Sequence, residues 1–126
     1  MTRRALGRFG ERFAAEYLER ALGWRVERKN WRCRWGELDL VARTPSGVLV
    51  IVEVRTRRTD GYGAALESVT AGKRARLARL TRRLLADWTG PAPAVVRVDV
   101  IGLTVRGRRV VAMEHIRGAI ESVCDE

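Results

Sequence analysis

Three carboxylates stand in stretches of the chain that otherwise read as strands of a protein interior. Glu37 and Asp39 lie two residues apart in GELDL, and Glu53 follows fourteen residues after Asp39 in VLVIVEVR. Buried carboxylates that lie close together repel one another and rise in pKa unless a cation sits between them. His115 is the only histidine, so a metal site would depend on oxygen ligands, which favours Mg²⁺ or Mn²⁺ over zinc.

The two segments that carry these acids are predicted to pair as an antiparallel hairpin. Strands are expected over residues 37–43 and 48–55, joined by the turn sequence TPSG. In-register pairing places opposite one another residues whose numbers sum to about 91 or 92, which brings Asp39 beside the Glu53 region. The second strand is almost continuously apolar, so we expect it to be central and covered on both faces.

A helix predicted over residues 5–22 would carry one more acid toward this hairpin. Its expected apolar stripe consists of Leu6, Phe9, Phe13, Tyr17 and Ala21. Glu11 falls at the border of the stripe, whereas Glu19 falls on the opposite, solvated side. Position alone therefore separates the two acids.

The remaining elements indicate the fold class. We expect a strand over 24–31, a helix over 70–88 with Leu77, Leu80, Leu84 and Trp88 inward, strands over 95–105 and 110–114, and a helical turn over 116–123. The order α-β-β-β-α-β-β predicts an α/β sandwich around a small mixed sheet flanked by helices. The strand after the second helix can return beside the central strand.

Several motifs resemble those of a known family. Asp39 followed by Glu53-Val54-Arg55 resembles the Asp and Glu-x-Lys signature of the PD-(D/E)xK nuclease superfamily, which has the restriction-endonuclease-like fold. GExxAxxYL from Gly10, GELDL from Gly36, VEVRTR at 52–57, Tyr62-Gly63, and Lys73 with Leu77 occur in the order seen in the YraN family of small bacterial proteins. The resemblance covers nearly the whole chain and implies a restriction-endonuclease-like α/β fold.

The resemblance also implies a metal centre and a hydrolytic reaction. Asp39, Glu53 and the main-chain carbonyl of Val54 would bind Mg²⁺ or Mn²⁺. Glu11, which matches a helix-borne acid of archaeal-type Holliday junction resolvases, would bind the ion directly or through water. Arg55 stands where the superfamily has lysine, and a permanently protonated arginine can orient water or stabilise phosphate charge but cannot accept a proton.

Three further charged residues are expected around these ligands, each with two interpretations. Glu37 is either an outer ligand or a salt-bridge partner of a nearby arginine. Arg57 either contacts the nucleic-acid backbone or is an ordinary surface charge. Lys73 either supplies the missing ammonium group or is the first member of a solvated basic helix.

A different interpretation of the whole cluster is a buried ion-pair network in which arginines neutralise the acids. Arg55 and Arg57 would then pair with Asp39 and Glu53. Because such networks seldom stabilise a protein relative to apolar replacements, we favour the metal site.

The charge balance indicates a polyanionic partner. The chain has 25 Lys and Arg against 15 Asp and Glu, a formal net charge of +10, although arginine enrichment also follows from a GC-rich genome. Nucleic-acid contacts are expected from Arg28, Lys29, Arg32, Arg34, Arg76, Arg79, Arg82 and Arg83. Trp31 and Trp35 either stack on unpaired bases or pack in the core, whereas Trp24 and Trp88 are expected in the core.

These observations predict a metal-dependent endonuclease that hydrolyses phosphodiesters in branched or single-stranded DNA during recombination or repair. The alternative is a non-catalytic nucleic-acid-binding module that retains the nuclease fold. We expect residues 1–126 to form one cytoplasmic domain with no membrane partner, because no apolar run could span a bilayer. Cys33 and Cys124 are expected to be reduced, and a homodimer follows only by analogy with junction-cutting enzymes.

Overall fold

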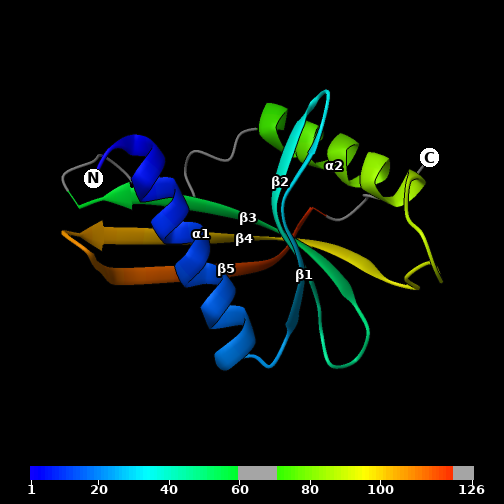
Figure 1. The fold of residues 1–126 in the computed structure, drawn as a ribbon, viewed down its shortest axis with the longest axis horizontal. Helices are drawn as coiled ribbons and strands as arrows, with labels where there is room; N and C mark the ends of the chain where they lie inside the picture. The colour runs from blue at the N-terminus through cyan, green and yellow to red at the C-terminus, as the bar shows by residue number, and fades with distance from the viewer. Residues whose placement is uncertain (60–70, 121–126) are drawn as a thin grey trace.

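The computed structural model describes residues 1–59 and 71–120, in which a five-stranded mixed sheet is flanked by two helices (Figure 1). The elements are α1 (Arg3–Arg20), β1 (Arg25–Cys33), β2 (Gly36–Arg43), β3 (Leu49–Arg58), α2 (Ala71–Ala86), β4 (Val96–Arg106) and β5 (Arg109–Ile120). The strands lie side by side in chain order. This is the predicted element order, and it is consistent with a small restriction-endonuclease-like fold.

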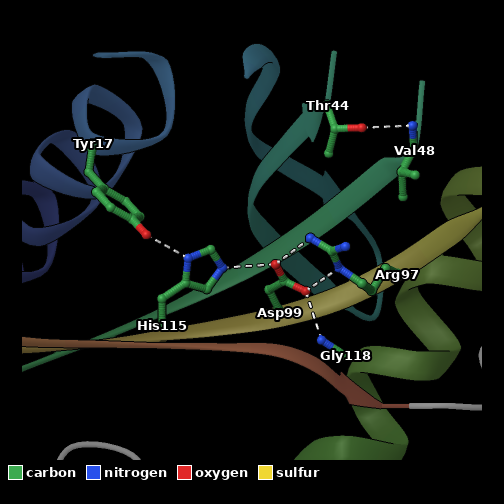
Figure 2. Close-up of polar contacts among 7 residues, drawn as sticks. All are labelled: Tyr17, Thr44, Val48, Arg97, Asp99, His115 and Gly118. Carbon is green, nitrogen blue, oxygen red and sulfur yellow. Dashed lines mark hydrogen bonds and ion pairs between the residues drawn. The ribbon is translucent and has the colours of Figure 1, made fainter. Parts of the chain in front are cut away.

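Strand β3 occupies the centre of the sheet, as its apolar sequence predicted. It pairs antiparallel with β2 and parallel with β4, and residues 49–54 are all buried. The connection through α2 allows β4 to return parallel to β3. The turn before β3 is closed by the side chain of Thr44, whose Oγ1 accepts a hydrogen bond of 3.0 Å from the main-chain N–H of Val48 (Figure 2).

The two helices cover opposite faces of the sheet, because successive residues of β3 point to alternate sides. Val50 and Val52 pack in one core cluster with Leu18 of α1, and Leu49 and Ile51 pack in another with α2. The α2 contribution to the second cluster is Leu77, Leu80 and Leu84, as predicted. No helix in the described ranges is long and apolar enough to cross a membrane.

Helix α1 packs on the sheet through smaller residues than the sequence pattern predicted. Its buried positions are Leu6, Gly10, Ala14, Ala15 and Leu18, whereas Phe13 is 37% exposed. The physical reason is close approach: a Cβ on Gly10 would lie 1.8 Å from Oγ1 of Thr56 on β3. The buried face is therefore shifted from the expected stripe, in which Leu6 and Tyr17 do contact the core but Phe13 and Ala21 are exposed.

The last strand is longer than predicted. β5 continues through residue 120, so residues 116–120 are extended where a helical turn was expected. Its pairing with β4 reaches Val98 opposite Ile120, with a register shift near Gly118, which has a φ of +65°. The rest of that expected turn, Tyr62-Gly63 and Cys124 lie outside the described residues.

Candidate functional site

The acidic residues of the hairpin lie where β2 and β3 part. The last pair of the β2–β3 ladder is Leu40 opposite Val52, whose numbers sum to 92. The next positions in register are Asp39 and Glu53, as the sequence predicted. Oδ2 of Asp39 accepts a hydrogen bond of 2.8 Å from the main-chain N–H of Val54. The carboxylate thus satisfies a strand donor at the point where the backbone ladder ends.

The local environment makes Asp39 an unusual acid. Burial and the nearby charge of Glu53 raise its pKa to about 7, and the charge of Glu37 acts in the same direction. The N–H of Val54 opposes this rise, and the close approach of the Glu53 side chain adds to it. Glu53 is 6% exposed. Two carboxyl groups, Glu53 buried and Asp39 half-buried, therefore share a site that favours a proton or a cation between them.

Glu11 of α1 is the third acid at this point. Burial raises its pKa, as do the charges of Asp39 and Glu37, while a hydrogen bond from Asn30 opposes the rise. Nδ2 of Asn30 donates to Oε1 of Glu11 over 2.9 Å. Glu11 of α1 therefore lies near Asp39 of β2, whereas Glu19 is exposed.

Asn30 is a site residue that the sequence reasoning missed. It lies between Lys29, which pairs with Leu40, and Trp31, which pairs with Leu38, and so stands opposite Asp39. Its φ of +51° is the only positive value among the described non-glycine residues. Asparagine tolerates this conformation better than most residues. Extending the hairpin pairing to β1 would have placed it beside Asp39.

Arg55 contributes a half-buried cation whose Nε atom has no hydrogen-bond partner. Its Nε forms a long ion pair with Oε2 of Glu53, at 3.7 Å, which is beyond hydrogen-bonding distance. This nitrogen is buried and has no hydrogen-bond partner. Because a satisfied ion-pair network would leave no such donor, the geometry argues against complete neutralisation of the acids by this arginine.

The possible metal ligands at this site are of the kind that a hard cation prefers, but they are few. Within residues 1–59 and 71–120, no group of three or more acidic, histidine or cysteine side chains is placed to hold a metal ion. Asp39 and Glu53 are two oxygen donors from adjacent strands, and the predicted third donor is the main-chain oxygen of Val54. Such an all-oxygen set fits Mg²⁺ or Mn²⁺.

The outer charged residues have different surroundings. Glu37 forms a salt bridge of 2.8 Å with Arg32, which matches the salt-bridge interpretation of this residue. Arg57 is half-buried on β3, two residues beyond Arg55. Lys73 is half-buried in the first turn of α2.

A small cavity of about 180 Å³ adjoins Glu11. Its lining residues are Arg8, Glu11, Arg12, Lys29, Asn30 and Leu40. Arg8 and Arg12 were not among the predicted contact residues, although the position of Arg8 three residues before Glu11 in the same helix could have indicated it. Positive charge therefore surrounds the outer side of the acid cluster.

The tryptophans divide into packed and exposed residues. Trp24 is 6% exposed, and Trp31 and Trp88 pack against the α2-side core, which confirms the core prediction for Trp24 and Trp88. Trp35 is 55% exposed. The guanidinium of Arg28 lies 5.4 Å from the ring centre of Trp88.

The basic side chains of α2 largely project into solvent, as predicted. Arg79, Arg82 and Arg83 are exposed, whereas Arg76 is half-buried against the start of β2. The helix therefore presents positive charge on the side away from its leucines.

A second polar network is centred on Asp99 (Figure 2). Asp99 of β4 is fully buried and accepts hydrogen bonds from Nε of Arg97 at 2.8 Å and the N–H of Gly118 at 3.0 Å. Nε2 of His115 lies 2.8 Å from Asp99, and Nδ1 lies 2.8 Å from the hydroxyl of Tyr17. The chain of bonds ties α1, β4 and β5 together.

This network keeps Asp99 ionised in spite of its position. Burial opposes the charge, but the hydrogen bonds from His115, Arg97 and Gly118 outweigh it and lower the pKa of Asp99. The sequence reasoning used His115 only to argue against a histidine-based metal site and missed this role. The pairing of Ile101 with His115 on the neighbouring strands decides it, and that register is not visible in local sequence.

Comparisons with known proteins identify the family. The profile described as uncharacterised protein family UPF0102 matches residues 10–103. A UPF0102 protein of Kineococcus radiotolerans is 47% identical over 114 residues, which cover 90% of this chain and 92% of that protein. UPF0102 proteins of Herpetosiphon aurantiacus and Chloroflexus aurantiacus are 44% and 46% identical, over 91% and 94% of this chain and 93% and 94% of their own lengths. The chain therefore belongs to the UPF0102 family, which is the YraN family that its motifs resemble.

Proposed function

We propose that the protein is a metal-dependent endonuclease that hydrolyses phosphodiesters in structured DNA. Asp39, Glu53 and the carbonyl of Val54 would hold Mg²⁺ or Mn²⁺, with Glu11 binding directly or through water. The observation that carries the proposal is the close pair of carboxyl groups, Glu53 buried and Asp39 half-buried, beside a buried arginine nitrogen without a hydrogen-bond partner. Placing such a group in a protein interior for structure alone seldom stabilises the fold.

The bound ion would supply Lewis acidity, activating water and withdrawing charge from the phosphodiester. The chain's own residues have separate tasks. Arg55 directs a permanent positive charge toward the acid pair, where it can stabilise the growing negative charge on a phosphate oxygen. Arg8, Arg12 and Lys29 line the cavity beside Glu11 and can hold the flanking phosphates in place.

A second candidate function is a DNA-binding module that does not cleave. Two observations favour it. Arg55 cannot accept a proton, and the described residues hold no group of three metal-binding side chains. The fold and the positive surface would serve this function equally well.

Metal titration tests the proposed centre. Calorimetry should detect Mg²⁺ or Mn²⁺ binding to the wild type and no binding to Asp39→Ala or Glu53→Ala. Glu19→Ala removes a carboxylate from the exposed side of α1 and should bind as the wild type does. Unchanged binding in both site variants would rule the centre out.

Cleavage assays separate the two candidate functions. Branched and single-stranded DNA would be incubated with wild type and Glu53→Gln in Mg²⁺ and in Mn²⁺. The nuclease proposal expects cleavage by wild type only. Intact binding with no cleavage by either protein under any condition would select the binding module.

A further inference from the structure

Trp35 stands at the turn between β1 and β2, where it gains little from packing. It is 55% exposed, whereas the other three tryptophans of the chain are buried or packed against a core cluster. Exposed aromatic side chains beside cations are typical of surfaces that bind a partner. The residues around this ring therefore indicate which kind of partner it could bind.

An open pocket of about 430 Å³ lies between this turn and α2. Its lining residues are Trp35, Arg79, Leu80, Arg82 and Arg83. Leu80 is 1% exposed and gives the pocket an apolar base, three guanidinium groups surround it, and no carboxylate is among these described lining residues. An apolar surface with a cationic rim suits a flat uncharged ring that is attached to an anion.

The turn is held against α2 by the glycine that follows Trp35. Gly36 has a φ of +145°, and a Cβ there would lie 3.4 Å from both Nη1 of Arg76 and Cδ1 of Leu80. The backbone thus lies directly on the helix. Both walls of the pocket are positioned before any ligand arrives, which reduces the entropic cost of binding.

Two guanidinium groups already lie near the ring. The Cζ atoms of Arg34 and Arg83 are 5.2 and 5.7 Å from the ring centre of Trp35. Arg83 also pairs with Asp87 at 3.3 Å, and both side chains are about half exposed, so this contact is weak. Either arginine can turn to a phosphate when another flat group stacks on the indole.

A second pocket, beside Trp88, is less suited to the same ligand. Glu27 lies among its lining residues, and Nε1 of Trp88 donates to the carbonyl of Pro91 over 3.2 Å. Trp88 is also packed against the core. The indole of Trp88 is already engaged in core packing and a hydrogen bond, and the carboxylate of Glu27 would repel a phosphate.

We propose that the Trp35 pocket is a subsite for one unpaired nucleobase, stacked on the indole, with the flanking phosphates held by the α2 arginines. The inference rests on the proposed nucleic-acid function and narrows it. A paired base inside a duplex is already stacked on its neighbours and cannot enter, so the pocket favours single-stranded or flapped substrates.

Binding to base-bearing and base-free strands tests the subsite. The full chain in EDTA is titrated against a labelled oligothymidylate, a strand of equal length and charge made of abasic residues, and a blunt duplex. Trp35→Ala should weaken oligothymidylate binding about tenfold, the effect of losing one base stack, and leave the other two affinities unchanged. Trp35→Phe, which keeps a smaller aromatic face, should lose less.

Further controls separate base stacking from simple charge attraction. Arg108→Ala removes an exposed charge from the β4–β5 turn and should not alter the preference for the base-bearing strand. If Trp35→Ala lost the same affinity for the oligothymidylate and the abasic strand, or lost affinity for neither, the subsite would be overturned. A requirement for Trp35 in binding polyglutamate would also overturn it. Because the titrations contain no metal, they measure binding whether or not the protein cleaves DNA. If the wild type cleaves DNA but Trp35→Ala binds oligothymidylate as tightly as the wild type, the subsite is overturned and the nuclease proposal still stands.

Discussion

The raised pKa of Asp39 shows how a single residue of the candidate site can lower the stability of the folded protein. Its pKa rises from 3.8 to about 7 because it is buried and lies beside Glu53. Between these values the folded protein keeps a proton that the unfolded chain has released. Stability should therefore fall as the pH rises from about 4 to 7 and stay reduced above that range.

Asp39→Asn should raise the melting temperature of the metal-free protein. The amide cannot ionise, and its oxygen can still accept from the N–H of Val54, so the gain should be larger at pH 8 than at pH 5. Thermal unfolding in EDTA at both pH values measures this. Glu19→Gln is the exposed control, and an Asp39→Asn gain that did not change with pH would contradict the assignment.

Asp99→Ala should be strongly destabilising, by about 3–5 kcal/mol, because it strands Arg97 and His115 without their buried partner. Asp87→Ala breaks the exposed pair with Arg83 and should cost less than about 1 kcal/mol. Chemical denaturation of the three proteins at neutral pH gives the comparison. Since the pKa of Asp99 is lowered, its contribution should disappear as the pH falls below the ordinary aspartate range.

At the scale of elements, the contact between α1 and β3 positions Glu11. Gly10, the neighbour of Glu11, lies so close to Thr56 that no side chain fits between them. Gly7, one turn earlier in the same helix, has open space where a methyl group would stand. Alanine substitutions at the two glycines therefore distinguish the effect of packing, at Gly10, from the effect of helix propensity, at Gly7.

Gly10→Ala should lower the free energy of unfolding by about 1–3 kcal/mol through overpacking. Gly7→Ala should instead raise it by up to about 1 kcal/mol, because alanine favours the helix. Denaturant titration of both variants checks the difference. Equal effects from the two substitutions would show that α1 does not lie in close contact with β3.

For the whole molecule, the net charge of +10 dominates any encounter with a polyanion. The exposed arginines of α2 lie away from the β4–β5 turn, which is at the far end of the sheet (Figure 1). Charge-driven DNA binding should release counterions and weaken steeply with salt. The strength of this dependence reports how many phosphates are contacted.

DNA affinity should fall linearly with salt on a logarithmic plot, and Arg82→Ala should reduce the slope by about 1. Arg108→Ala, on the β4–β5 turn, should leave the slope nearly unchanged. Anisotropy titrations between about 50 and 200 mM salt measure both. A flat dependence in the wild type would contradict the electrostatic account of binding.

Local patterns in the sequence were sufficient for much of the fold. The continuous apolar run predicted that β3 is central, and the turn between the two acidic strands predicted the register that brings Asp39 beside Glu53. These features depend on residue alternation and short connections, which can be read over a few positions. The apolar stripe proposed for α1 was confirmed at Leu6 and Tyr17 and wrong at Phe13 and Ala21, because helix rotation depends on the close approach at Gly10.

The sequence by itself determined the element order, the acidic hairpin and the excess of positive charge. Only the tertiary structure decided that Asn30 meets Glu11, that His115 bridges Asp99 and Tyr17, and that Trp35 alone among the tryptophans is largely exposed. Each of these depends on residues brought together from distant parts of the chain. The periodicity of apolar residues indicates which side of an element faces the core. Which distant residue a given side chain contacts depends on how whole elements pack together.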